Sequence, residues 1–165
     1  MLSTRLFRHA VLTALLALLV APMAHAAGSK AKEKPADNGD VFYNMGVDQM
    51  KEGNFEGAVT SFQKAVAVKK DHAEAHNNLA YSLRKLGKDN YDDALKHYNK
   101  AIELNPKLAQ AYHYRGVLHA LAGDEGAAKA DHAKLVDLDR ELADELMKVI
   151  ASGEEPEGLG GAAWK

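Results

Sequence analysis

Three glycines stand at nearly equal intervals along this chain of 165 residues, and each lies between two stretches with helical periodicity. Gly53, Gly87 and Gly123 are separated by 34 and 36 positions. A helix that is followed closely by another often ends at a glycine, which adopts the left-handed conformation without strain. Self-similarity at a period of this length predicts a stack of similar supersecondary units.

The apolar residues around these glycines follow the spacing of amphipathic helices. They recur at intervals of three and four, as in Phe55, Val59 and Phe62, and the strict alternation of strands is absent, so the fold class is predicted to be all-α. One hairpin cannot bury such a face alone, so three hairpins must stack and share a continuous core. Further positions align on the same period: Gly46, Ala80 and Gly116; Ala58, Ala94 and Ala128; Phe62, Tyr98 and His132; and Ala65, Ala101 and Leu135.

The aligned positions resemble the tetratricopeptide repeat (TPR) family. That family places a small residue in the first helix of each hairpin, an alanine and an aromatic residue in the second, and a proline afterwards. The middle copy matches best and ends at Pro106, whereas Lys70 and Arg140 stand at the proline position of the other two copies. The resemblance covers about residues 40–140 and implies a right-handed superhelical stack of three antiparallel helical hairpins.

Two departures from the repeat pattern are expected to shape the domain. The middle copy carries two extra residues near Lys88, which should lengthen the turn between its helices. An amphipathic segment follows the third copy, with Asp139 as its expected N-cap and Leu142, Leu146 and Val149 on one face. We expect this segment to cap the open end of the stack, because repeat arrays need a solvated terminal element.

The chain divides into a predicted signal peptide (1–26), a flexible linker (27–39), a TPR domain (40–151) and a disordered tail (152–165). Linker and tail are rich in glycine and charge and poor in large apolar residues, so they cannot offset their ordering entropy. Within the domain, repeats are expected over about 39–72, 73–108 and 109–140, followed by the capping helix over 140–151. Helices are predicted near 40–52, 55–69, 72–86, 91–104, 107–121, 124–138 and 140–151.

The first 26 residues have the order of a secretory signal. Arg5 and Arg8 precede an uncharged apolar run, and Ala24-His25-Ala26 offers small residues before a cleavage point. The run, over 10–20, is too short to cross a bilayer, which needs about 20 residues, and the arginines do not form a twin-arginine pair. We expect export through the general secretory route to the periplasm or beyond, without stable membrane insertion after cleavage. A buried N-terminal helix is the alternative.

Composition excludes several classes of function. The chain has no cysteine, which excludes disulfides, thiol catalysis and cysteine-ligated metals. Without Arg5 and Arg8, 19 basic residues face 23 acidic ones, and this net charge of −4 gives no general attraction to nucleic acid or anionic lipid. No nucleophile elbow, glycine-rich phosphate loop or paired carboxylates in a defined pocket appear, so neither an enzyme nor a cofactor is expected.

Six histidines follow the signal segment, so a metal or catalytic site has to be weighed. His72 and His76 are four apart on one helical face, which suits two imidazoles on one ion, but no adjacent glutamate completes a zincin motif. His76, His119 and His132 stand at packing positions, which favours structural roles. We predict no metal site and keep as an alternative a metal-responsive or catalytic protein that uses His72, His76, His97 or His113.

The resemblance also implies where a partner binds. In TPR arrays the first helix of each hairpin lines a concave groove, and exposed residues there contact the ligand. Asparagine amides can donate to and accept from a peptide backbone, and tyrosines add apolar area with a polar tip. By register these residues are Tyr43, Asn44, Val47 and Met50 in the first copy, Asn77, Asn78, Tyr81 and Arg84 in the second, and His113, Tyr114, Val117 and Ala120 in the third.

The carboxylate clamp of chaperone-binding family members is not expected here. Asn78 matches one clamp asparagine, but Tyr43, Val47, Gln110 and Tyr114 stand where lysine, asparagine and basic residues would be needed. The chain is therefore expected to be a non-enzymatic scaffold or assembly factor of the cell envelope that binds a peptide or protein segment in its groove. A structural subunit that docks through its convex face or its tail, with Trp164, is the remaining alternative.

Overall fold

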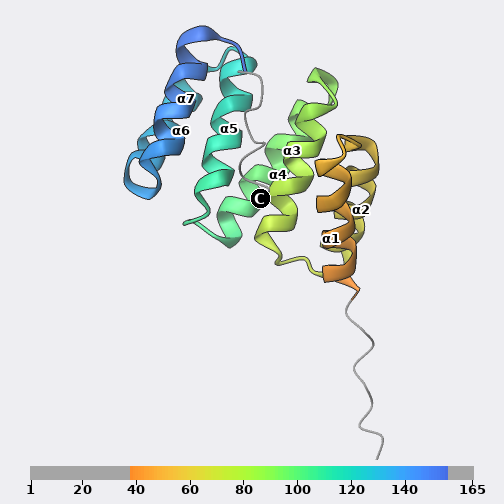
Figure 1. Ribbon diagram of the computed structural model, residues 1–165. Coiled ribbons are helices and arrows are strands. Elements are labelled where there is room, and N and C mark those ends of the chain that lie inside the picture. The colour runs from red at the N-terminus through yellow and green to blue at the C-terminus, as the bar shows by residue number, and fades with distance from the viewer. Residues whose placement is uncertain (1–37, 156–165) are drawn as a thin grey trace, which may run out of the picture. The chain divides into compact units, whose positions relative to one another are not determined.

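The computed structural model describes residues 38–155 (Figure 1). The predicted signal peptide, most of the predicted linker, and residues 156–165 with Trp164 lie outside this range. The described part contains α-helices and one short 3-10 helix but no strand, and none of its helices is long and apolar enough to span a membrane. The helices are α1 (Gly39–Lys51), α2 (Phe55–Val68), α3 (Ala73–Lys85), η1 (Lys88–Asn90), α4 (Tyr91–Leu104), α5 (Ala109–Leu121), α6 (Glu125–Leu138) and α7 (Arg140–Ser152).

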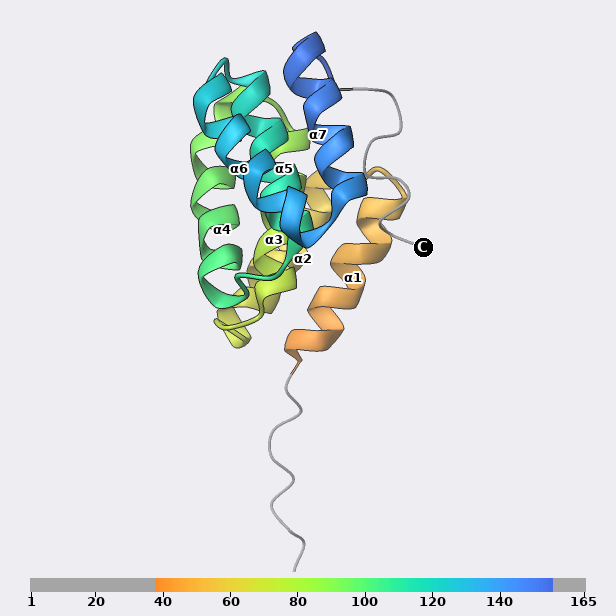
Figure 2. The ribbon, with the colours of Figure 1, turned by 90° about the vertical axis from the view of Figure 1, so that its left-hand side faces the viewer.

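The first six α-helices pair into hairpins, α1 with α2, α3 with α4 and α5 with α6 (Figure 1). Helix α2 packs against α3, and α4 packs against α5, so the hairpins stack in chain order. Helix α7 packs against both helices of the last hairpin, as Figure 2 also shows. The predicted all-α stack of TPR-like hairpins is confirmed, and α7 occupies the place expected of the capping helix.

The three turn glycines have the backbone geometry that their spacing predicted. The φ angle is 75° at Gly53, 110° at Gly87 and 84° at Gly123. Residues with a Cβ atom rarely adopt positive φ, so glycine ends the first helix of each hairpin at little cost. The 3-10 helix η1 lies where the middle copy has its two extra residues, so the insertion lengthens this turn as expected.

The predicted helices begin and end within two residues of the observed ones. The main difference is at the C-terminal end of the last helix. Helix α7 extends through Ser152 and is capped by Gly153, whose φ is 70°. Glu155 then forms an ion pair with Arg84 of α3. The disordered tail predicted from residue 152 is therefore wrong for residues 152–155, because a tertiary contact between positions 71 residues apart orders a segment without apolar side chains.

Polar side chains cap the N-termini of α2, α6 and α7. The side chains of Asn54, Asp124 and Asp139 accept hydrogen bonds from backbone N–H groups three residues later, at 2.9, 3.0 and 3.1 Å. Each of these bonds satisfies one of the N–H groups that a helix start leaves unpaired. The predicted N-cap Asp139 is confirmed.

The small residues of the repeat pattern lie where two helices approach closely. A Cβ atom added at Gly46 would stand 2.6 Å from Cε1 of Phe62, a fully buried ring on the paired helix α2. A Cβ atom at Gly116 would collide with the side chain of Leu146 on α7. Ala80, at the equivalent position of α3, has no exposed surface. Close helix packing is therefore the physical reason for small residues at these positions.

Replacing Gly46 with alanine is expected to lower the free energy of unfolding by about 2 kcal/mol, because the new methyl group overpacks a rigid buried ring. Gly126→Ala in α6 is the matched control. Its Cβ atom would meet nothing closer than 3.7 Å, so the higher helix propensity of alanine should leave stability equal or slightly greater. Urea titrations followed by circular dichroism measure both changes. Equal effects of the two substitutions would contradict the packing argument.

Candidate functional site

The predicted groove residues lie on one continuous row formed by α1, α3 and α5. Helix α3 contacts both α1 and α5, so the first helices of the three hairpins are direct neighbours. We call the side of this row that carries the predicted residues the inner face. The residues are Tyr43, Asn44 and Val47 on α1, Asn77, Asn78, Tyr81 and Arg84 on α3, and His113, Tyr114 and Val117 on α5.

Most residues of the inner face are buried, contrary to the prediction that they are exposed. Asn44 is exposed, and Tyr43 and Val47 are half-buried. The residues on α3 and α5 are all buried, and the Arg84 residue is only 3% exposed. Helix α3 has α1 on one side and α5 on the other, and Arg84 of α3 is also covered by Glu155, which follows α7. On α3 and α5 the inner face is therefore closed to solvent rather than an open groove.

Aromatic rings form the centre of the inner face. The Tyr81 and Tyr114 ring centroids are 5.0 Å apart in an edge-to-face arrangement. The Tyr81 ring also meets Phe55 of α2, at 6.1 Å, and the Tyr114 ring lies 5.1 Å from the imidazole of His113. Such pairs hold their partners in fixed geometry and stabilise the interface between α3 and α5.

The Arg84 guanidinium lies beside this aromatic centre and is paired with Glu155. Its carbon atom is 5.1 Å from the Tyr81 ring centroid. Nη1 donates to Glu155 Oε2 at 2.5 Å and Nη2 donates to Oε1 at 3.1 Å, while Lys85 Nζ lies 3.7 Å from Oε1. Burial raises the pKa of Glu155, but the hydrogen bonds and charges of Arg84 and Lys85 outweigh it and lower that pKa below its usual value. Glu155 is therefore ionised at neutral pH.

Several buried polar atoms of the inner face have no hydrogen-bond partner among residues 38–155. They are both ring nitrogens of His113, Oδ1 of Asn77 and Nε of Arg84. Burial lowers the pKa of His113 to about 4, so its imidazole is neutral at pH 7. Buried polar groups are normally paired, so these unpaired atoms set the inner face apart from an ordinary apolar core.

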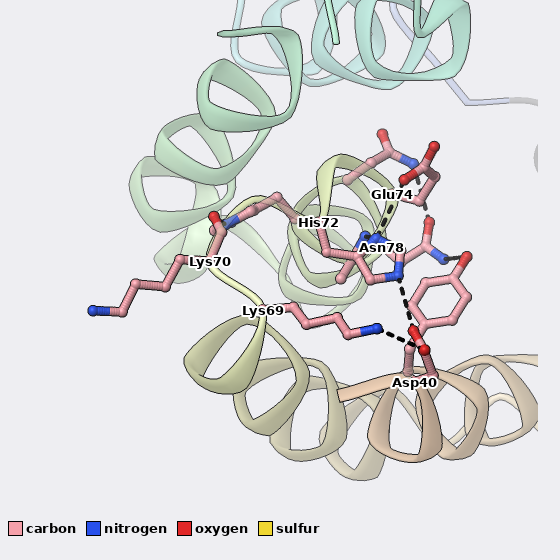
Figure 3. Close-up of polar contacts among 10 residues, drawn as sticks. Asp40, Lys69, Lys70, His72, Glu74 and Asn78 are labelled. Atoms are coloured by element: carbon pink, nitrogen blue, oxygen red, sulfur yellow. Dashed lines mark hydrogen bonds and ion pairs between the residues drawn. The ribbon is translucent and has the colours of Figure 1, made fainter. Parts of the chain in front are cut away.

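A polar junction holds the end of the inner face at α1 (Figure 3). Asp40 accepts a hydrogen bond from Lys69 Nζ at 2.6 Å, and His72 Nδ1 lies 3.2 Å from a carboxylate oxygen of Glu74. The Tyr43 ring stacks on His72 with centroids 4.7 Å apart, and its hydroxyl accepts from Asn78 Nδ2 at 3.3 Å. These contacts position Tyr43 and Asn78 between the first two hairpins.

The histidines do not converge on one point. His72 caps α3 by accepting a hydrogen bond from Ala75 N at 3.4 Å, whereas His76 pairs with His97 of α4 through Nδ1 atoms 3.0 Å apart. Burial lowers the pKa of both His76 and His97. Within the described residues, no group of three or more histidine, aspartate or glutamate side chains could hold a metal ion. His72 and His76 thus act in separate packing contacts.

Two acidic residues of the site were not predicted. Glu155 pairs with Arg84, and Glu145 Oε2 of α7 lies 3.7 Å from His113 Nε2. Glu145 is half-buried in the structure. The one signal for Glu155 was the acidic pair in SGEEPEG, but an acidic pair alone indicates solvent rather than an arginine partner.

The sequence is similar to known repeat proteins. The family profile described as "TPR repeat" matches residues 48–87 and 88–123. "Photosystem I assembly protein Ycf3" of Acaryochloris marina is 29% identical over 97 residues, which cover 56% of this chain and 58% of that protein. The chain spans less than two thirds of the length of the curated relatives compared with it.

Solved structures show the same fold. The first TPR domain of Spaghetti (RPAP3), bound to the HSP90 peptide SRMEEVD, superposes with a TM-score of 0.63 at 22% identity over 70% of this chain and 94% of that one. YrrB, described as a TPR protein with an unusual peptide-binding site, has a TM-score of 0.62 at 28% identity over 67% of this chain and 57% of that one.

Proposed function

The chain carries tetratricopeptide repeats, and from this premise we propose that it is a non-enzymatic interaction scaffold or assembly factor of the cell envelope. Its inner face on α1, α3 and α5 binds a segment of a partner protein. Each of the three hairpins counts as one repeat in this proposal. Residues 1–26 have basic, apolar and small residues in the sequence order of a secretory signal, which supports export to the envelope.

The observation that carries the proposal is the row of α1, α3 and α5, the first helices of three stacked TPR-like hairpins. Buried polar atoms of this row, the ring nitrogens of His113 and Oδ1 of Asn77, have no partner among residues 38–155 and would pair with a peptide backbone only after local opening of the face. The neighbouring rings of Tyr81 and Tyr114 supply the rigid aromatic area that is common at binding hot spots. The names of the compared proteins, an assembly protein and two peptide-binding TPR proteins, support the same class of function.

The burial of the inner face decides how this proposal is tested. Alanine at Tyr81 or Tyr114 would remove core area and cost about 3 kcal/mol or more, so lost binding would not distinguish a site from a fold defect. Asn44 is exposed on α1 at a predicted groove position, so a photo-reactive phenylalanine analogue can replace it without disturbing packing. Lys96, exposed on the outer helix α4, is the matched control position.

Cross-linking in the native envelope is expected to give one partner adduct from position 44 and none from position 96. The physical reason is that position 44 belongs to the proposed inner face, whereas position 96 is exposed on α4. Mass spectrometry of the adduct identifies the partner and the contacting peptide. Adducts from position 96 alone, or equal adducts from both positions, would place binding on another surface.

A further inference from the structure

We propose that Arg84 anchors a glutamate side chain of the partner segment, and that Glu155 of this chain occupies the same anchor until the partner displaces it. The inference rests on the proposed function, because it names the chemistry that the inner face recognises. Arg84 is not one of the positions of the carboxylate clamp considered above. The proposed anchor is therefore distinct from that clamp.

The geometry of the ion pair shows what Arg84 selects. Both terminal nitrogens of its guanidinium point to the two oxygens of one carboxylate. This fork arrangement distinguishes a carboxylate from an amide or a hydroxyl group, because the carboxylate alone accepts twice along parallel directions. The Arg84 side chain is 1% exposed, so its charge has almost no water around it. A buried cation of this kind requires an anionic partner.

Glu155 is an occupant of this anchor and not part of the hydrophobic core. It follows the end of α7, beyond the glycine cap at Gly153, and belongs to neither core cluster. Among the described residues, its side chain is paired with Arg84 and Lys85. The Ser152 hydroxyl donates to the backbone carbonyl of the adjacent Glu154 at 3.0 Å and accepts from its backbone N–H at 3.2 Å. Contacts of this size can open locally without unfolding of the repeat stack.

The surroundings of Arg84 specify the rest of the ligand. Tyr81 lies under the guanidinium and holds it beside the aromatic centre of the inner face. His113 and Asn77 lie on the same face, and their buried ring nitrogens and Oδ1 have no hydrogen-bond partner among residues 38–155. A ligand that fits is therefore an extended peptide with a glutamate side chain at its centre. Glu155 reproduces this feature within the chain itself.

An internal occupant weakens binding of the external ligand by mass action. A segment tethered next to its site has an effective concentration in the millimolar range. The apparent dissociation constant of a competing peptide equals the intrinsic constant divided by the fraction of open protein. Removing the carboxylate of Glu155 should therefore open the anchor and tighten binding of an acidic peptide.

The test uses the full chain and a fluorescent peptide with the sequence of residues 152–158, acetyl-SGEEPEG-amide. Glu155→Gln is expected to bind this peptide at least about tenfold more tightly than the unaltered protein, because the variant lacks the tethered competitor. Glu154→Gln is the matched control, since it removes the same charge one position earlier and should bind like the unaltered protein. Fluorescence anisotropy measures all three dissociation constants.

Two further measurements test the anchor itself. The peptide acetyl-SGEQPEG-amide, which lacks the central carboxylate, should bind Glu155→Gln at least about tenfold more weakly than the acidic peptide. Adding Arg84→Gln to Glu155→Gln should abolish the preference for the acidic peptide, and circular dichroism verifies that this double variant stays folded. Glu155→Gln itself alters no core residue, so its result stands even where the double variant unfolds.

The possible outcomes separate this inference from the proposed function. Equal affinities of Glu155→Gln and the unaltered protein for the acidic peptide would overturn the role of Glu155. Equal affinity of Glu155→Gln for the two peptides would overturn Arg84 as an anchor, while a partner adduct from position 44 would still support the scaffold. Tight binding of the acidic peptide together with adducts from position 96 alone would support the anchor and overturn the proposed partner site.

Discussion

Lowering the pH from 7 to 4 is expected to remove about 3 kcal/mol of stability through His113 alone. The imidazole is 1% exposed and has a pKa of about 4 in the folded protein, compared with about 6.5 in an unfolded chain. Desolvation is the main cause, and the nearby Arg84 cation lowers the pKa further, whereas Glu155 and Asp139 oppose the shift. Glu145, at 3.7 Å, is the closest carboxylate.

The sign of this effect follows from proton binding. Between pH 6.5 and pH 4 the unfolded chain binds a proton at this histidine and the folded protein does not, so acid favours unfolding. The contribution is complete above pH 6.5, falls as the pH decreases through this window, and is lost at pH 4. His76, His97 and His119 also have lowered pKa values and add to the same trend. Protonation of each of these histidines therefore also favours the unfolded chain.

His113→Leu separates the contribution of this residue from the others. Leucine has an apolar side chain of similar size to histidine. The substitution removes two ring nitrogens that have no hydrogen-bond partner among the described residues. Urea titrations at pH 7, 6, 5 and 4 should show a steep loss in the unaltered protein and a loss smaller by about 3 kcal/mol in the variant. Parallel pH profiles would show that His113 titrates normally.

Replacing Asp131 with alanine is expected to destabilise the protein by about 3 kcal/mol, because the substitution breaks a buried ion pair that joins three helices. Asp131 of α6 is 2% exposed and accepts two hydrogen bonds from Arg115 of α5, at 3.0 Å from Nε and 2.6 Å from Nη2. Arg115 Nη1 also donates to Asn99 Oδ1 of α4 at 2.6 Å. The side chain of Arg115 keeps some contact with water, so the loss falls at the lower end for buried pairs.

An exposed ion pair on the same helix provides the control for Asp131. Glu125 accepts from Lys129 at 2.5 Å, but both side chains are more than half exposed. Exposed pairs contribute less than about 1 kcal/mol, so Glu125→Ala should have a small effect. Thermal and urea unfolding compare the two variants, and a cycle with Arg115→Ala isolates the coupling between Arg115 and Asp131. Comparable losses from the two variants would contradict the importance of burial.

The repeat architecture was predictable because it depends on local patterns. A turn glycine with positive φ, a small residue at a helix crossing and an N-cap such as Asp139 each act within one or two helical turns. Repetition of these patterns at one period then indicates stacking, since each hairpin exposes the same apolar face. Helix ends could therefore be placed within two residues.

The state of the inner face was not predictable in the same way. The register placed Arg84, Tyr81 and His113 on the correct helices, but it treated them as exposed. Their burial depends on residues far away in the chain, such as Glu155 beside Arg84. A repeat pattern describes which face a residue occupies and carries no information about the distance between helices.

What the sequence by itself determined is the helical repeat, its turns and its caps, because these follow from periodicity and backbone geometry over short distances. Only the tertiary structure decided that Glu155 meets Arg84 and that His113 loses its solvent. Arg84 and Glu155 are 71 residues apart in the chain, and the burial of His113 depends on other helices. Electrostatic and desolvation energies act through space and not along the chain.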